Sequence, residues 1–372
     1  MIKIVKKIFC TFVCTSAFSI PALATTDYLF TQAKSLAKTD TKASISLGID
    51  MVNDTVDIFD IRDSEGVKGD AGDYKGFHFK ADYQISPLFN IEGAYWHREI
   101  EYGKDNNEIQ TPYLALTFSP ETLQTSKSAF DLKLSTWSNI SDNIKKSGST
   151  QVGNISTPLQ DIQVEDIKDL QFQLDGIFSH QIDFMNQINL FTGIGYSKVS
   201  VEQLKFQATH EKLGMNGCAA NVTVSSNNQY TAISTPQCDD LFTVIVEGDA
   251  RDFGVDIQKD LNYDSYYASL GGSWNWRYRQ FESQLAYQYQ RLWRKDIDDR
   301  ISNFGNSPIK DNHTFGAKFS YDFTPKLTGY LQGQLFQNNL VGYVPFLYNG
   351  VTASRLDKRY GLASIGIQYN GF

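Results

Sequence analysis

Histidines and serines are the residues of this sequence that could support hydrolysis. The five histidines are His78, His97, His180, His210 and His313. A histidine within hydrogen-bond distance of a serine can take its proton and turn it into a nucleophile. The strand pattern described below places His97 and His313 near one rim of the fold, with Ser302, Ser307 and Ser320 as candidate partners. Serine is abundant enough to explain this proximity by chance, so we expect no catalytic residues.

Metal binding has one candidate, the acidic cluster Asp296, Asp298 and Asp299. Loop carboxylates of this kind can bind Ca²⁺ weakly. The basic residues Arg294, Lys295 and Arg300 lie among them, which favours a solvated loop with internal charge balance. The sequence also has no phosphate-binding loop and no dinucleotide fingerprint. We therefore expect neither a metal nor a cofactor.

The start of the chain resembles a leader that directs a protein to its compartment. Three lysines, Lys3, Lys6 and Lys7, precede an apolar run over residues 8–20, and Pro21 and the sequence Ala22-Leu23-Ala24 follow. A short apolar run with a basic start and small residues at its end is typical of a secretory signal peptide. We predict a cleavable signal peptide over residues 1–24; the alternative interpretation is a membrane anchor.

Two cysteines, Cys218 and Cys238, lie beyond this leader, whereas Cys10 and Cys14 lie within it. In an oxidising compartment such a pair is expected to form a disulfide. The closed loop has about twenty residues, which the chain-entropy estimate converts into about 3 kcal/mol of stabilisation. We predict a structural disulfide.

Composition favours strands and argues against nucleic acid as a partner. The chain contains 20 Tyr and 25 Phe but only 9 Pro and 4 Met. Without the three lysines of the leader, 31 of the 34 basic residues face 42 acidic residues, a formal net charge of about −11. No basic stripe is present, so we expect no nucleic-acid binding.

Alternation of apolar and polar residues over about ten positions recurs along the chain. In the first segment Ala43, Ile45, Leu47, Ile49 and Met51 share one face, and polar or small residues share the other. This pattern is typical of transmembrane β-strands, which face lipid on one side and a lumen on the other. Similar segments are predicted near residues 77–85, 89–95, 114–118, 130–134, 170–178, 188–194, 266–276, 281–293, 315–323, 327–335 and 363–369. The sequence therefore predicts about twelve strands.

The links between these segments alternate between short and long. Short links such as 86–88 and 277–279 alternate with long ones such as 138–168 and 201–262. Short periplasmic turns opposite longer extracellular loops are typical of outer-membrane barrels. We predict an all-β fold: a transmembrane antiparallel up-and-down β-barrel over residues 43–372, with long extracellular loops and a disulfide in the loop at about 201–262.

The end of the chain resembles the terminal β-signal of outer-membrane barrel proteins. Ile365, Ile367 and Tyr369 alternate before the terminal aromatic Phe372, which is one residue out of phase; a bulge at Gly371 would restore the phase. The resemblance is to the class of Gram-negative, porin-like outer-membrane barrels and matches no single family. It implies an integral location in the cell outer membrane, contact with membrane lipids and lipopolysaccharide, and handling by periplasmic chaperones and the assembly machinery. We expect a monomer.

The inward positions are the remaining candidates for function. The predicted lumen residues carry both signs of charge, with acids in excess: Asp50, His78, Lys80, Asp82, Glu92, Asp131, Lys133, Asp175, Glu282, Lys318 and Asp322. One hypothesis is a passive channel for small solutes, cationic or neutral and polar. A second is a closed barrel whose loops bind a surface partner, with Tyr343, Phe346 and Tyr348 exposed; a lipid hydrolase at the rim is a third.

The segment before the first strand has a different pattern. Residues 28–37 place apolar side chains at helical spacing. We assign residues 25–42 to a short N-terminal periplasmic segment, which is either a short helix or plug or a flexible tail.

Overall fold

The computed structural model describes residues 29–30, 42–52, 73–102, 105–150, 159–209, 219–235, 243–303, 307–338, 344–349 and 359–371. The predicted signal peptide, the two cysteines of the predicted disulfide, His210, Tyr343 and Phe372 lie outside these residues. No helix within the described part is long and apolar enough to cross a bilayer.

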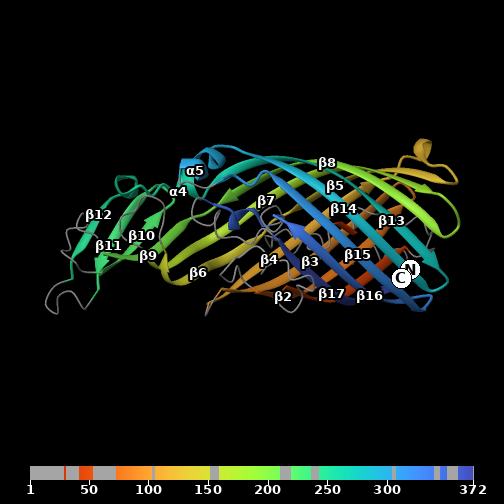
Figure 1. Cartoon of the computed structure of the whole chain (residues 1–372), viewed down its shortest axis with the longest axis horizontal. Helices are drawn as coiled ribbons and strands as arrows, with labels where there is room; N and C mark the ends of the chain where they lie inside the picture. The colour runs from red at the N-terminus through yellow and green to blue at the C-terminus, as the bar shows by residue number, and fades with distance from the viewer. Residues whose placement is uncertain are drawn as a thin grey trace, which may run out of the picture.

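Twelve antiparallel strands close into a barrel (Figure 1). They are β1 (Ala43–Val52), β2 (Asp73–Ser86), β3 (Phe89–Tyr102), β4 (Asp105–Phe118), β5 (Ser128–Trp137), β7 (Leu159–Gln181), β8 (Asn186–Ser200), β13 (Tyr263–Tyr278), β14 (Phe281–Arg294), β15 (Asp311–Thr324), β16 (Leu327–Gln337) and β17 (Arg359–Asn370). Each strand pairs with the next one in this order, and β17 pairs with β1 to close the ring. The prediction of about twelve strands is confirmed, and each predicted segment lies in one of them.

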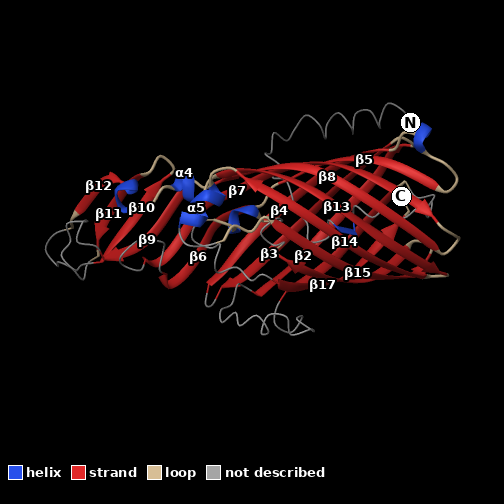
Figure 2. Cartoon of the chain, turned by 45° about the horizontal axis from the view of Figure 1, so that its top comes forward, coloured by secondary structure: helices blue, strands red, loops and turns tan. Residues whose placement is uncertain are grey.

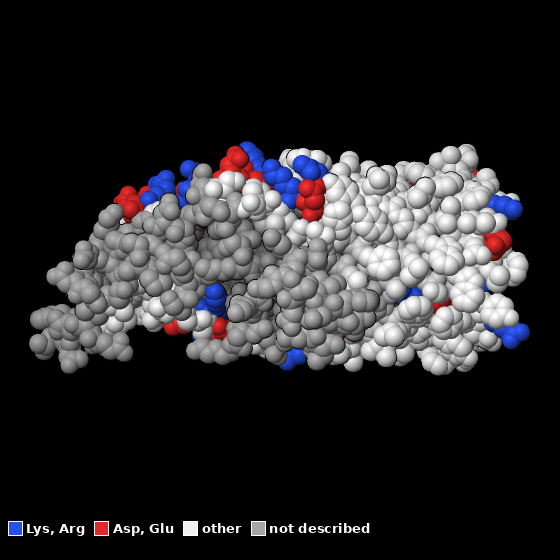
Figure 3. All heavy atoms as spheres, in the orientation of Figure 1, with Lys and Arg blue, Asp and Glu red and all other residues white. Residues whose placement is uncertain are grey.

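The outer wall is apolar. Side chains such as Leu270, Ile365 and Trp293 are at least half exposed, at 62%, 62% and 50% of their surface. In Figure 3, charged residues gather over one end of the molecule and at the tip of the other, and a mostly uncharged band lies between them. Such exposure is unfavourable in water and favourable in lipid, so this band marks the membrane-spanning part of the barrel.

Both chain ends of the barrel and its tight turns lie at the same rim. β1 begins and β17 ends there, where Gly371, in the left-handed region with φ of 133°, donates its N–H to the Ala43 carbonyl at 3.1 Å. Only glycine adopts such a φ at low cost. The irregular backbone at this position agrees with the sequence, which predicts a bulge at Gly371. In the turn between β7 and β8, hydrogen bonds from the Asn186 amide and from the Met185 and Asn186 N–H groups hold the pKa of Asp183 below its usual range. By the topology of such barrels this is the periplasmic rim.

The described strands form one sheet, and five of them extend it beyond the opposite rim as the extracellular sheet (Figures 1 and 2). It contains β6 (Ile140–Thr150), β9 (Gln203–Thr209), β10 (Ala219–Ser225), β11 (Gln229–Ser234) and β12 (Ile245–Asp249). The 23-residue strand β7 joins it to the barrel: residues Leu159–Ile167 pair with β6 and β9, and from Lys168 onward the strand pairs with the barrel strand β8. The links at 138–168 and 201–262 therefore hold paired strands. The sequence pattern predicts loops for both, with one short strand signal over residues 242–246 that overlaps β12.

Short helices lie at the junction of this extracellular sheet and the barrel mouth. They are η4 (Ala250–Phe253), α4 (Ile257–Asp260), α5 (Ile297–Asn303) and η5 (Pro345–Leu347); a further one, η2 (Glu121–Leu123), lies in a periplasmic turn. Ile257, Ile297 and Ile301 are fully buried. The apolar core therefore sits at the mouth and in the extracellular sheet rather than in the membrane-spanning wall.

This topology predicts which turns face the outside of the cell. An epitope tag inserted between Thr243 and Val244, directly before β12, is expected to bind antibody on intact cells, because both residues are exposed and β12 lies beyond the extracellular rim. A tag between Thr125 and Ser126, in the link after η2, is expected to bind only after the outer membrane is permeabilised. Surface labelling of the second tag on intact cells would contradict the orientation.

Candidate functional site: the barrel lumen

The structure places all eleven predicted lumen residues on the inner side of the wall. They divide by depth: Asp50, His78, Asp131, Lys133 and Asp175 have at most 2% of their surface exposed. The other six, which lie closer to the periplasmic rim or beside the deep group, are half-buried: Lys80, Asp82, Glu92, Glu282, Lys318 and Asp322. Whether they line a conducting pore stays a prediction.

The periplasmic part of the lumen is a vestibule of paired charges. Lys133 Nζ lies 2.8 Å from Glu92 Oε2 and 5.4 Å from the centre of the Tyr113 ring. On the other side, Arg277 contacts both Glu282 and Asp322, at 3.4 and 2.6 Å. A buried charge is costly unless it is paired, so these contacts let the wall carry both signs of charge at low cost.

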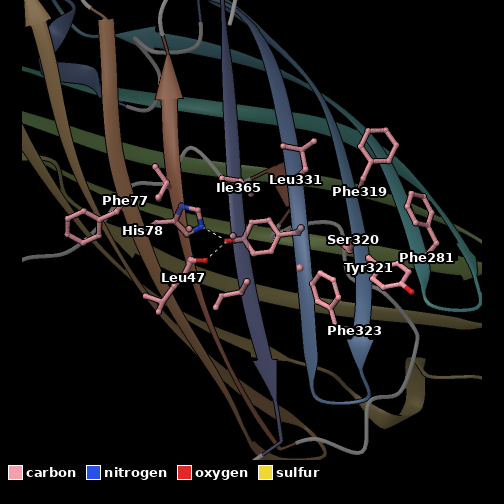
Figure 4. A pocket seen from close by; sticks show the side chains of 16 residues that line it. Leu47, Phe77, His78, Phe281, Phe319, Ser320, Tyr321, Phe323, Leu331 and Ile365 are labelled. Atoms are coloured by element: carbon pink, nitrogen blue, oxygen red, sulfur yellow. Dashed lines mark hydrogen bonds between the residues drawn. The ribbon is translucent and has the colours of Figure 1, made fainter.

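A polar clasp crosses the seam between the first and last strands. His78 on β2 places Nδ1 2.9 Å from Asp50 Oδ2 on β1 and Nε2 2.6 Å from the Tyr330 hydroxyl on β16 (Figure 4). Ser364 on β17 donates to the same aspartate. The clasp thus joins four consecutive strands around β1 and β17, and its histidine is fully buried.

Two glycines make room for the clasp. Gly48 pairs with both His78 and Gly366, and Gly366 pairs with Tyr330, so the two rings meet across strands that have no side chain at that level. A Cβ at Gly48 would lie 2.4 Å from His78 Cε1, and one at Gly366 would lie 2.3 Å from the Tyr330 oxygen. Neither position can accept a side chain without displacing the clasp.

A second polar group, which the sequence analysis missed, lies near the extracellular side. Asn139 accepts from Arg98 and Thr111, at 3.3 and 3.0 Å, and donates to Asp169 Oδ2 at 2.8 Å. All four residues are buried. The alternation of β3, continued beyond Trp96, places Arg98 in the lumen. Asn139 lies in the link 138–168, which the sequence pattern predicts to be a loop, and Asp169 lies directly after that link.

Apolar and aromatic side chains pack at the extracellular mouth. Phe346 and Tyr348, in and after η5, are 4% and 0% exposed, contrary to the surface-binding hypothesis, in which they are exposed. Tyr348 lies under the Arg294 guanidinium, 4.1 Å from ring centre to Cζ, and its hydroxyl accepts from the Ile309 N–H at 2.8 Å. The Pro345 carbonyl accepts from Tyr263. These contacts hold η5 and Tyr348 at the mouth, where they supply an apolar face and a backbone acceptor.

The other described histidines do not build a hydrolase site with the predicted serines. His97 stacks on Phe77 at 5.4 Å and His313 bonds the Tyr287 hydroxyl at 2.8 Å, both on the outer side of the wall. Ser320 lies on the lumen side of β15, and Ser302 donates to the Asp298 carbonyl. A Ser–His contact does occur near the periplasmic rim, between Ser128 Oγ and His180 Nδ1 at 2.8 Å, and the His180 ring stacks on Phe178.

A shallow groove of about 690 Å³ lies on the wall beside the seam (Figure 4). Its lining is mostly outward-facing and apolar, including Leu331, Phe319 and Ile365, and it reaches Gly48 and Gly366 beneath the clasp. Acyl chains of the bilayer contact this wall, so the groove is a lipid-facing surface. Among the described residues, no three of His, Cys, Asp and Glu gather as they would around a metal ion.

No protein-family model matches the sequence, and no curated protein matches it. Solved structures do resemble it. The KdgM porin in complex with disordered oligogalacturonate has 8% identity and a TM-score of 0.37, with 88% of this chain and 99% of that chain covered. The translocator domain of the autotransporter NalP from Neisseria meningitidis has 6% identity and a TM-score of 0.47, with 92% and 93% covered. The Pseudomonas putida toluene transporter TodX has 11% identity and a TM-score of 0.35, with 94% and 95% covered.

At such scores the assignment depends on the chain's own geometry. A closed ring of twelve antiparallel strands, an uncharged outer band and a polar interior occur together here. The protein is an outer-membrane β-barrel. Its architecture is porin-like, and its lumen is the candidate functional site.

The glycines of the seam give a test of the clasp. Gly48→Ala is expected to lower the free energy of unfolding by about 1–3 kcal/mol, since the new methyl group overlaps the His78 ring. Gly333→Ala is the matched control, because its Cβ would meet no atom closer than 3.9 Å. Urea unfolding of both variants in detergent, followed by the gel shift between folded and unfolded barrel, measures the difference. Equal stability of the two would show that the clasp does not constrain the seam.

Proposed function

We propose that this barrel is a passive channel for small polar solutes, neutral or cationic, and that the conformation described here is its closed state. The observation that carries the proposal is the half-buried charged wall of the vestibule, with Lys80, Asp82, Glu92, Glu282, Lys318 and Asp322 around it. A barrel that serves only as a scaffold has no need of charged groups that remain accessible to water.

The sign of the wall supports a preference for cations. Among the eleven predicted lumen residues, seven are acids and three are lysines. Arg277 and Arg98 add two positive charges and Asp169 adds one negative charge, so acids still outnumber bases by eight to five and the potential favours positive solutes. Acids at a narrow, partly desolvated passage act more strongly on a permeating ion than the same acids in bulk water, because screening is weaker there.

Charge-neutral variants test this preference. Asp82→Asn and Glu282→Gln are each expected to reduce the cation-to-anion permeability ratio by about twofold, since each removes one negative charge from the vestibule. The measurement is the reversal potential of single channels in a planar bilayer under a KCl gradient. Glu121→Gln, on the exposed periplasmic helix η2 and outside the lumen, is the matched control and should leave the ratio unchanged.

Electrical silence of a protein shown to be folded by its gel shift would overturn the channel function. Conduction with an unchanged ratio in both lumen variants would retain the channel and remove the proposed selectivity.

The extracellular sheet favours a second candidate function, recognition of a partner at the cell surface. It projects beyond the mouth and exposes Ile233, Val244 and Ile245, at 41%, 43% and 60% of their surface. Exposed apolar residues outside the membrane are typical of interaction surfaces. On this hypothesis, Ile233→Ser combined with Ile245→Ser should reduce adhesion of intact cells to the partner surface and leave channel conductance unchanged. If the protein is only a channel, the double variant should change neither adhesion nor conductance.

A further inference from the structure

A small apolar cluster lies in the lumen, separate from the large apolar core. Leu29 and Phe30, a helical fragment from the segment before β1, pack there against Ile177, Phe191 and Ala286. Leu29 is 0% exposed and Phe30 is 6% exposed. These two side chains are therefore enclosed by the wall, not resting at its rim.

The wall around this cluster is polar. Gln284 and Gln288 flank Ala286 on the lumen face of β14, and Asn189 precedes Phe191 on that of β8. Apolar side chains that face water or amide groups are not stabilised, whereas burial against an apolar partner lowers their free energy. The wall thus has a small apolar patch that needs an apolar occupant.

Small residues shape this patch into a socket. Gly316 pairs with Ala286, and a Cβ at Gly316 would lie 2.6 Å from Leu29 Cδ2 and 2.7 Å from Phe30 Cζ. Gly271 similarly gives way to the Phe191 ring, whose Cε2 would be 2.2 Å from an added Cβ. The two glycines and the alanine together leave the volume that Leu29 and Phe30 fill.

A cation borders the socket. Lys318, two residues along β15 from Gly316, places its Nζ 6.0 Å from the centre of the Phe30 ring and 4.5 Å from that of Tyr330. An ammonium near an aromatic face is favourable, and more so where water is scarce. The socket therefore suits an aromatic group better than a purely aliphatic one.

We propose that the lumen contains a binding site for an aromatic and branched apolar side-chain pair, and that Leu29 and Phe30 occupy it as a tethered plug. The position of the plug is supported by the packing of Leu29 and Phe30 alone. Its effect on permeation rests on the proposed channel function.

The tether allows the plug to leave without unfolding the barrel. Twelve residue steps separate Phe30 from Lys42, at the periplasmic rim, and an extended chain of that length reaches about 40 Å. Leu29 and Phe30 can therefore leave the socket while β1 keeps its pairing with β2 and β17.

Thiol accessibility tests the occupancy directly. In a background in which every cysteine of the purified chain is serine, Ala286→Cys is placed in the socket and a membrane-impermeant cationic methanethiosulfonate is added from the periplasmic side. We expect slow modification with the plug intact and at least a tenfold faster rate when Leu29→Ser and Phe30→Ser are combined. Phe184→Cys, at a turn residue 84% exposed, is the matched control and should react fast in both backgrounds.

A variant in the barrel wall tests the plug without changing Leu29 or Phe30. Gly316→Val should expel the plug because its side chain occupies the position of Leu29 Cδ2, whereas Gly333→Val, with space around its Cβ, should not. Each variant is first shown to be folded by its gel shift. Conductance of the same proteins in a planar bilayer is then expected to rise several-fold for the serine pair and for Gly316→Val, and to stay unchanged for Gly333→Val.

The outcomes separate the two proposals. Equal modification rates at position 286 with and without the serine pair would overturn the plug. Faster modification without any gain in conductance would support the plug and overturn the channel function on which its gating effect rests.

Discussion

The structure depends on one constraint: inside a bilayer every backbone N–H and carbonyl must find a partner within the protein. A sheet satisfies it only by closing, so the pairing of β1 with β17 is the contact that every other strand requires. The clasp of Asp50, His78, Tyr330 and Ser364 lies at this pairing and adds side-chain bonds across it. Its buried histidine is better understood as part of closure than as a catalytic group, because both ring nitrogens already have partners.

Closure in turn creates an interior that twelve strands leave too wide for wall side chains alone to fill. The chain fills it in three ways at three depths. Ion pairs such as Lys133–Glu92 occupy the vestibule, Leu29 and Phe30 occupy the middle, and η5 with Tyr348 occupies the mouth. Only the wall is imposed by the membrane. In the middle and at the mouth the filling comes from segments that precede or connect the strands, and these can move without breaking the ladder of backbone hydrogen bonds.

The sequence alone predicts the structure where one physical rule dominates. Lipid on one side and lumen on the other force the two-residue period, so the twelve strands and the side of the wall on which Asp82, Glu92 or Lys318 lies could be predicted. The extracellular strands could not, because β6 and β9–β12 have no lipid-facing side and their polarity resembles that of a loop. Phe346 and Tyr348 were expected at the surface because spacing in a connection does not reveal whether it folds back. The helical spacing around Leu29 and Phe30 predicts a helix or a plug. Their location follows only from the structure, in which they pack against Gly316 on β15.

Strand β7 runs through both the extracellular sheet and the barrel wall. Its first residues pair with β6 and β9 outside the membrane, and further along the same strand Ile177 forms part of the socket in the lumen. A pull on the extracellular sheet along this strand loads its ladder to β5 and β8 in shear, where many hydrogen bonds share the force, rather than opening them one at a time. The barrel can therefore serve as a mechanical anchor: tension applied at the cell surface is transmitted along one continuous backbone and dissipated in the wall.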